Sequence, residues 1–219
     1  MVNGKKSPRR FVFLDRDGVI NVDPNDYTTT IEQWIWAEGA LEGIQKLTEA
    51  GFGIVIITNQ ACIAKGLQSE EGLEKLHRYM LDGIDRAGGS IIGIYHCPHK
   101  TGDGCSCRKP EPGMLFKAAE DFSIPLSETF MIGDSLTDME AGKRAGTRTI
   151  LIDSDSNEKK VTDDTNLTEK EKKKRNSDGM ATQSEPSDFR ATNLLEAANI
   201  VIRETPACIN NHMGKPNEK

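Results

Sequence analysis

Two carboxylates that could attack, transfer protons or bind a metal follow a short apolar run near the start of the chain. Residues 11–14 are Phe-Val-Phe-Leu, and Asp15, Arg16, Asp17 and Gly18 come directly after them. Such a run is typical of a buried strand, which would place both aspartates at a sheet edge where ligands bind in open α/β proteins. Carboxylates held close together can share a hard cation or divide a nucleophilic and an acid–base role. An Asp-x-Asp triplet is also common in polar loops, so its interpretation depends on the rest of the chain.

Three further groups of polar residues lie at the ends of predicted elements. They are Thr58, Asn59 and Gln60 after one apolar run, Arg108 and Lys109 before a helix, and Asp134 and Asp138 after another apolar run. Ligand sites of open α/β sheets lie at the carboxyl ends of the strands, so we expect these groups to face the first two aspartates. Taken singly, Asp134 could be a helix N-cap and Lys109 a surface lysine.

A group of sulfur and nitrogen donors lies just before Arg108. It consists of Cys97, His99, Cys105 and Cys107. Three thiolates and one imidazole make a tetrahedral zinc set, and four protein ligands would close the coordination sphere of a structural ion. We therefore expect a zinc loop over residues 97–107, which would stiffen the segment leading to Lys109; the alternative is unconnected thiols. His77 and His96 have no evident partner in the sequence, which favours surface or packing roles.

Apolar runs alternate along the chain with segments of helical periodicity. The predicted strands are 11–15, 54–58, 91–97, 129–133 and 147–152 with a short edge strand at Phe189, and the predicted helices are 39–50, 69–87, 113–122, 136–145 and 193–203. This alternation predicts an α/β fold with a doubly wound, mostly parallel sheet and right-handed crossovers. The length suits a single domain over residues 1–219.

One segment interrupts the alternation. Residues 154–187 are dense in charged and small polar side chains and contain almost no large apolar residue. Such a composition cannot bury enough surface to offset the entropy of ordering, so we predict a disordered insertion. The alternative is that the basic run 172–175 binds a partner. The closing strand and helix are expected over residues 188–204.

Composition excludes several classes of function. The net charge of −6 argues against a general nucleic-acid surface, which needs an excess of lysine and arginine. No stretch approaches the length of a membrane span, and the apolar run after the basic N-terminus is too short for a signal peptide. Five cysteines in such a chain favour metal binding or reduced thiols over disulfides. We expect a soluble, cytoplasmic, monomeric protein.

The motifs follow one another in a recognisable order. Asp-x-Asp-Gly, a Thr after an apolar strand, Lys-Pro and Gly-Asp-x-x-x-Asp resemble, in this order, the motifs of the haloacid dehalogenase superfamily of phosphatases. The resemblance implies a Rossmann-like fold and Mg²⁺-dependent hydrolysis of phosphomonoesters, with Asp15 as the nucleophile that forms an aspartyl phosphate. It implies Asp17 as general acid and base. It also implies Mg²⁺ held by Asp15, the backbone carbonyl of Asp17 and Asp134, with Asp138 in support.

The same resemblance assigns the remaining polar residues to the substrate. Thr58 and Lys109 would join the two aspartates in catalysis, Thr58 by donating a hydrogen bond and Lys109 by supplying a fixed positive charge. Asn59 and Gln60 would contact the substrate. Arg108 would bind a distal anionic group, and the alternative is a solvent-facing arginine.

The zinc loop within this pattern resembles the D-glycero-D-manno-heptose 1,7-bisphosphate 7-phosphatase and histidinol-phosphatase subgroup, whose members have a minimal cap. The resemblance implies a small phosphorylated metabolite as partner, first the 7-phosphate of the heptose bisphosphate and, as the alternative, histidinol phosphate. Residues 61–66 depart from the glycine-containing pattern usual in the subgroup. A function of another class, a catalytically silent zinc-containing binding module, is disfavoured because both aspartates, Thr58 and Lys109 are present.

Overall fold

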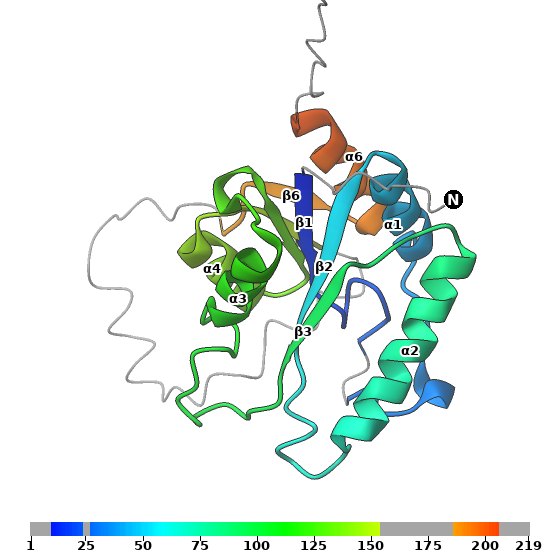
Figure 1. The fold of residues 1–219 in the computed structure, drawn as a ribbon, viewed down its shortest axis with the longest axis vertical. Coiled ribbons are helices and arrows are strands. Elements are labelled where there is room, and N and C mark those ends of the chain that lie inside the picture. The colour runs from blue at the N-terminus through cyan, green and yellow to red at the C-terminus, as the bar shows by residue number, and fades with distance from the viewer. Residues whose placement is uncertain (1–9, 24–26, 154–185, 206–219) are drawn as a thin grey trace, which may run out of the picture.

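The computed structural model describes residues 10–23, 27–153 and 186–205 of the 219-residue chain. Figure 1 shows a central twisted sheet with helices on both of its faces. The predicted insertion 154–187, with its basic run 172–175, lies outside the described residues except for its last two positions. Of these two, Ser187 is buried.

Six strands form one wholly parallel sheet in the order β3-β2-β1-β4-β5-β6. They are β1 Arg10–Leu14, β2 Phe52–Asn59, β3 Gly93–Cys97, β4 Phe130–Gly133, β5 Arg148–Ile152 and β6 Phe189–Ala191. The strand order reverses between β1 and β4, which is the arrangement of doubly wound folds, and this confirms the predicted fold class. In the centre of the sheet, Phe13 pairs in register with Val55 on one side and Met131 on the other.

Helices cover both faces of the sheet. They are α1 Ala40–Glu49, α2 Glu70–Arg86, α3 Gly113–Phe122, α4 Leu136–Ala145 and α6 Leu194–Glu204, with the 3₁₀ turns η1 Ile31–Gln33 and η2 Leu126–Glu128. One buried cluster joins Leu14 and Ile54 to α1, α2 and α6. A second cluster joins Phe13 and Ile57 to α3 and α4 on the opposite face. Because both faces are covered, the central strands β1, β2 and β4 are nearly continuous buried apolar runs without polar alternation.

The element boundaries follow local signals in the sequence. The bounds of α3 and α4 are those predicted, whereas β3 begins at Gly93, two residues after the predicted start. The α2 helix begins after Ser69, whose hydroxyl accepts a hydrogen bond from the Gly72 N–H at 3.1 Å. The edge strand expected at Phe189 is β6, which runs parallel to β5.

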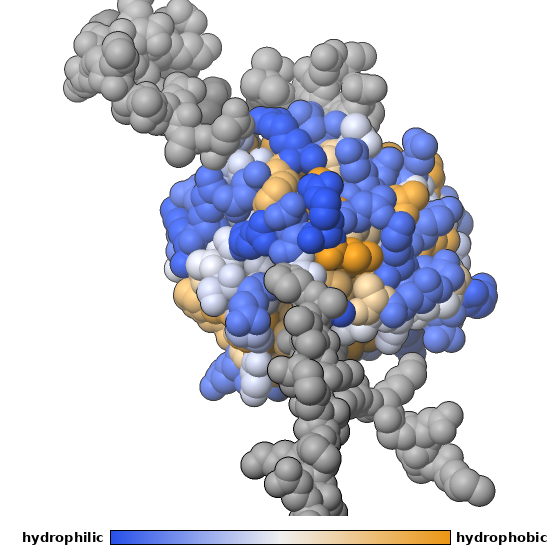
Figure 2. All heavy atoms as spheres, turned by 90° about the horizontal axis from the view of Figure 1, so that it is seen from above, coloured by the Kyte–Doolittle hydropathy of each residue, from blue (hydrophilic) through white to orange (hydrophobic). Residues whose placement is uncertain are grey.

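The surface at the α6 end of the molecule is mostly polar. Figure 2 looks onto the end of the molecule where α6 lies and shows mainly hydrophilic side chains with small, separate apolar areas. Across residues 10–23, 27–153 and 186–205, no helix combines the length and the apolar character that a membrane crossing requires.

Candidate active site

The central strands bring two of the predicted aspartates to the same sheet edge. Asp15 follows β1 and Asp134 follows β4, and the Asp15 N–H donates to the Ile132 carbonyl at 2.9 Å. Between them Gly18 has a φ of +81°, in the left-handed region that favours glycine. A side chain at Gly18 would also collide with the Asp134 carboxylate. The Asp-x-Asp-Gly turn can therefore approach Asp134 only because its last residue is glycine.

Three carboxylates and one ammonium group meet at this edge. One carboxylate oxygen from each of Asp15, Asp134 and Asp138 lies within 4.8 Å of the others. Lys109 Nζ lies 2.9 Å from Asp15 Oδ1 and 2.5 Å from Asp138 Oδ1. The Lys109 ammonium also donates to the Ile57 carbonyl at 2.8 Å. Asp138 owes its place to α4, whose first turn it caps by accepting from the Ser135 N–H at 3.1 Å.

The charges of this cluster shift the pKa values of its members. Burial and then the Asp138 carboxylate raise the pKa of Asp15 well above its ordinary value, although Lys109 opposes the shift. Burial alone would lower the pKa of Lys109, but the Asp138 and Asp15 carboxylates raise it. Three carboxylates against one ammonium leave an excess of negative charge on hard oxygen donors. This donor set fits Mg²⁺, which prefers carboxylate oxygens.

The second aspartate of the motif has different surroundings. The Asp17 carboxylate accepts hydrogen bonds from Arg16, from Asn21 Nδ2 at 3.0 Å and from Gln60 Nε2 at 2.8 Å. Burial alone would raise the pKa of Asp17, but the Arg16 guanidinium and the bonds from Arg16, Asn21 and Gln60 lower it. The two aspartates of one triplet therefore have pKa values shifted in opposite directions.

Arg16 is a residue of this site that the sequence analysis did not single out. Its side chain is only 1% exposed and forms an ion pair with Asp17 at 2.8 Å. The sequence places this arginine at the end of a buried strand, but its burial and its partners are evident only in the structure. His77, to which the sequence assigned no partner, lies 3.4 Å from Arg16 Nη1, and His96 pairs with Glu70 at 3.0 Å.

The residues that follow β2 contact other site residues. Thr58 is fully buried, and its hydroxyl accepts from Gln60 Nε2 at 2.8 Å. Asn59 donates to the Lys109 carbonyl and accepts from the Lys109 N–H, both at 3.1 Å. The Gln60 amide is fully buried between Thr58 and Asp17. In the structure, Asn59 and Gln60 therefore hold other site residues, and their predicted contact with substrate stays a prediction.

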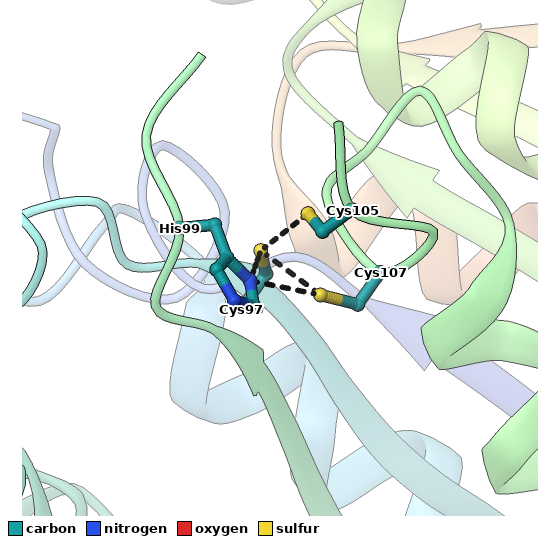
Figure 3. A group of neighbouring side chains, drawn as sticks. All are labelled: Cys97, His99, Cys105 and Cys107. Atoms are coloured by element: carbon teal, nitrogen blue, oxygen red, sulfur yellow. Dashed lines mark hydrogen bonds between the residues drawn. The ribbon is translucent and has the colours of Figure 1, made fainter. Parts of the chain in front are cut away.

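The predicted zinc ligands converge at the end of β3. Figure 3 shows Cys97, His99, Cys105 and Cys107 pointing toward a common centre. Their donor atoms lie 3.3–3.7 Å apart in the four contacts between them. In a tetrahedron with zinc–sulfur bonds of about 2.3 Å, sulfur atoms lie about 3.8 Å apart. The donor set and its spacing therefore fit a closed zinc site with His99 bound through Nδ1.

A pocket of about 430 Å³ lies between the loop that follows β3 and the start of α4. Its lining includes Asn59, Lys100, Arg108, Lys109, Ser135 and Thr137. Arg108 Nη1 donates to the His99 carbonyl at 3.1 Å, which ties this arginine to the cysteine loop. The pocket therefore places the cations Lys100 and Arg108 around a space that opens next to Lys109.

Comparison with known proteins agrees with this geometry. The HAD-hydrolase-like family model matches residues 106–178. The D-glycero-β-D-manno-heptose-1,7-bisphosphate 7-phosphatase of Pseudomonas aeruginosa is 39% identical over 144 residues, which are 66% of this chain and 81% of that enzyme. The chain belongs to the haloacid dehalogenase superfamily of phosphatases. A second phosphatase of the same name, from Pasteurella multocida, is 40% identical over 66% of this chain and 82% of its own length.

Solved haloacid dehalogenase structures share the fold. The D,D-heptose 1,7-bisphosphate phosphatase of Bordetella bronchiseptica, crystallised with magnesium and phosphate, matches with a TM-score of 0.71 and 30% identity over 89% of this chain and 99% of its own. A HAD-like phosphatase of Mesorhizobium loti matches with a TM-score of 0.69 and 27% identity over 90% of this chain and 88% of its own. Hydrolysis of phosphomonoesters is therefore the activity class of this chain.

Proposed function

We propose that the protein is a Mg²⁺-dependent phosphatase that removes the 7-phosphate of D-glycero-D-manno-heptose 1,7-bisphosphate. The observation that carries the proposal is the meeting of Asp15, Asp134, Asp138 and Lys109 at the carboxyl ends of β1 and β4. The named relatives favour the heptose bisphosphate over histidinol phosphate and over a silent zinc-binding module.

Asp15 is the proposed nucleophile. One of its carboxylate oxygens attacks phosphorus, the bond from phosphorus to the sugar oxygen breaks, and an aspartyl phosphate forms. Lys109, 2.9 Å from Asp15 Oδ1, limits the repulsion between the carboxylate and the incoming phosphate dianion. Thr58 is proposed to donate its hydroxyl hydrogen to a phosphoryl oxygen, a role its present contact allows because the hydroxyl accepts from Gln60.

Asp17 is the proposed general acid and base. A phosphate dianion bound nearby raises the pKa of this carboxyl, so that it can carry a proton and give it to the departing sugar oxygen. Once the alcohol has left, the ionised Asp17 takes a proton from the water that attacks the aspartyl phosphate. The lowered pKa of Asp17 in the free enzyme means that this carboxyl is ionised before substrate binds.

Two metals are proposed. Asp15, Asp134 and the backbone carbonyl of Asp17 would hold Mg²⁺, with Asp138 in support, because their oxygen donors match its preference. When bound, the cation neutralises charge on the phosphoryl oxygens. Zinc would be held by the four donors at the end of β3, Cys97, His99, Cys105 and Cys107. It would be structural, because four protein ligands leave no open position.

The substrate is proposed to lie in the pocket beside Lys109. Arg108 would contact the second phosphate of a bisphosphate, since its guanidinium can pair two oxygens of an anion. Asn59 remains a proposed substrate contact through the second N–H of its side-chain amide. Gln60 also remains proposed, although its side-chain and backbone N–H groups all donate within the protein. A single domain over residues 1–219, a monomeric state and a cytoplasmic location stay predictions.

A phosphate-release screen with Mg²⁺ tests the proposal. It compares heptose 1,7-bisphosphate with histidinol phosphate, fructose 1,6-bisphosphate and nucleotides, using the Asp15→Asn protein as the blank. We expect the highest kcat/KM for the heptose bisphosphate and none of these activities in the blank. A clear preference for histidinol phosphate would replace the substrate, and release by the blank would remove Asp15 from the mechanism.

A further inference from the structure

Arg16 is the largest fully buried side chain among the described residues. An arginine is always charged in a protein, and taking its charge out of water is costly unless the partner is well placed. Its position between Asp15 and Asp17 puts this buried charge inside the candidate active site.

The guanidinium holds both oxygens of Asp17. Arg16 Nη2 lies 2.8 Å from Asp17 Oδ1 and 2.9 Å from Oδ2, and Nε lies 3.2 Å from Oδ1. Each oxygen has one further donor, Asn21 for Oδ1 and Gln60 for Oδ2. A carboxylate held from both sides in this way has little freedom to rotate, so its orientation is set before substrate arrives.

The far end of Arg16 is held by another element. Its Nη1 lies 3.4 Å from Nε2 of His77, a residue of α2 that is 61 positions away. A guanidinium has no acceptor, so Nε2 must accept and the ring proton must lie on Nδ1. Burial and the charge of Arg16 lower the pKa of His77 to about 3, which agrees with a neutral ring. The Trp34 ring centroid, 5.9 Å from Cζ, flanks the same group.

Stability alone does not account for this arrangement. A buried ion pair contributes little net stability, because desolvation offsets most of its attraction, and apolar side chains often replace such pairs without loss. The described core around Arg16 is apolar and includes Trp34, Val19 and Ile20. Because the partner of Arg16 in this ion pair is Asp17, the proposed general acid and base, the pair indicates that Arg16 also serves the reaction.

We propose that Arg16 is a positioning residue: anchored by His77 of α2, it aims the Asp17 carboxyl at the oxygen of the leaving alcohol. The inference rests on the proposed role of Asp17 as general acid. It predicts that Arg16 matters most when the leaving group needs a proton. Sugar alkoxides need one, whereas p-nitrophenolate is a far better leaving group and departs without it.

The test compares two substrates in the full-length enzyme with Mg²⁺. In a two-step mechanism kcat/KM reports the steps up to alcohol release, so it isolates the first proton transfer. Arg16→Lys keeps the positive charge but removes the planar guanidinium that contacts both oxygens of Asp17. We expect this change to lower kcat/KM for the heptose bisphosphate about ten- to a hundredfold. For p-nitrophenyl phosphate the loss should be below about threefold, in line with a step that needs little acid catalysis. Arg148→Lys is the matched control, since Arg148 also lies over an aromatic ring, that of Phe130, and pairs with a carboxylate, that of Glu204.

A second pair of variants covers the case in which Arg16→Lys does not fold. His77→Leu removes the anchor of Arg16, and His77→Gln keeps an acceptor there. We expect His77→Leu to reduce alkyl phosphate turnover selectively and His77→Gln to restore most of it. Equal losses on both substrates, or no loss on either, would overturn the inference.

The outcome is separable from that of the proposed function. If the wild type prefers another alkyl monoester, the substrate proposal fails, and the same comparison is made with that monoester in place of the heptose bisphosphate. If the wild type hydrolyses no phosphomonoester at all, the proposed function and the role of Arg16 fail together.

Discussion

The side-chain amide of Asn59 forms a two-way bridge to the backbone of Lys109. It donates to the Lys109 carbonyl and accepts from the Lys109 N–H, both at 3.1 Å, across 50 residues of sequence. The end of β2 thereby fixes the residue that brings positive charge to Asp15. Lys109 comes two residues after Cys107, the last of the four proposed zinc ligands, so the chain on that side of Lys109 leads directly to the cysteine loop.

Removing this bridge should damage both catalysis and stability. Asn59→Ala leaves the Lys109 N–H and carbonyl without their partner, so we expect about 1–3 kcal/mol less stability. We also expect kcat to fall by roughly tenfold or more, because the ammonium is displaced from its place by Asp15. Asn193→Ala is the matched control: Asn193 caps α6, so stability should fall by about 1 kcal/mol with kcat unchanged. Denaturation curves and steady-state kinetics separate the two effects.

Asp15→Asn should abolish turnover while the protein stays folded. An amide cannot form the acyl phosphate. The pKa of Asp15 is raised in the folded state, so its ionised form destabilises the metal-free fold at pH values above its ordinary pKa. We therefore expect metal-free Asp15→Asn to be at least as stable as the wild type at pH 7, with the advantage vanishing toward pH 4. A clearly less stable variant at pH 7 would contradict this account.

His77 should make stability fall in mild acid. The folded ring has a pKa of about 3, below the ordinary value of 6.5, so the unfolded chain takes up a proton first as the pH falls. The free energy of unfolding should therefore fall progressively as the pH drops from about 6.5 toward 3, by up to about 1.4 kcal/mol per pH unit. His77→Gln removes this titration, so its stability should fall less steeply between pH 6.5 and 4.5. Parallel curves for the two proteins would show that His77 is charged in the fold.

The cysteine cluster should hold close to one zinc ion per chain. Replacing Cys105 and Cys107 together with serine should abolish zinc binding and lower the free energy of unfolding by several kcal/mol, because the energy of metal binding at a closed site is part of the folding energy. EDTA should remove Mg²⁺ more readily than zinc. Cys62→Ser is the control, since Cys62 is buried but lies outside the cluster. Elemental analysis checks the content, and full stability of the double variant would rule out the structural role.

Arg108 should matter for bisphosphates and hardly for monophosphates. A charge-assisted contact with the second phosphate is worth roughly 1.5–3 kcal/mol, so Arg108→Ala should lower kcat/KM for the heptose bisphosphate by about ten- to a hundredfold. p-Nitrophenyl phosphate has a single phosphate and should show little change. Arg78→Ala, at an exposed arginine of α2, serves as the control. Equal losses on both substrates would assign Arg108 to the reacting phosphate or to the scaffold of the loop.

Much of the fold could be predicted because its signals are local. The bounds of α3 and α4 follow from periodic apolar residues and, for α4, from the Ser135 cap, and they agree with the structure. The convergence of Asp15 and Asp134 could be predicted as well, since parallel strands share their carboxyl edge. The four proposed zinc ligands lie within residues 97–107, so a single turn of the chain is enough to bring them together.

The supporting contacts could not be predicted in the same way. Nothing in a single sequence indicates that Asn59 faces Lys109 or that His77 faces Arg16, because these pairs meet only after helices and strands have packed. The sequence therefore assigns Asn59 and Gln60 only to the substrate, a role that stays a prediction, and gives no sign of their contacts with other site residues. Arg16 was not singled out by the sequence analysis, although its burial and its ion pair with Asp17 make it part of the site.

The neighbouring positions of β1 and β4 also set an order of events during synthesis. Asp15, the proposed nucleophile, emerges from the ribosome with the first strand, whereas Asp134 and Asp138 follow more than a hundred residues later. β1 can pair with β4 only after those later residues have been made. A nascent chain that ends before β4 has Asp15 but lacks two carboxylates of the cluster. Phosphatase activity should therefore be absent from partly made chains, and it should appear abruptly as the fourth strand takes its place beside the first.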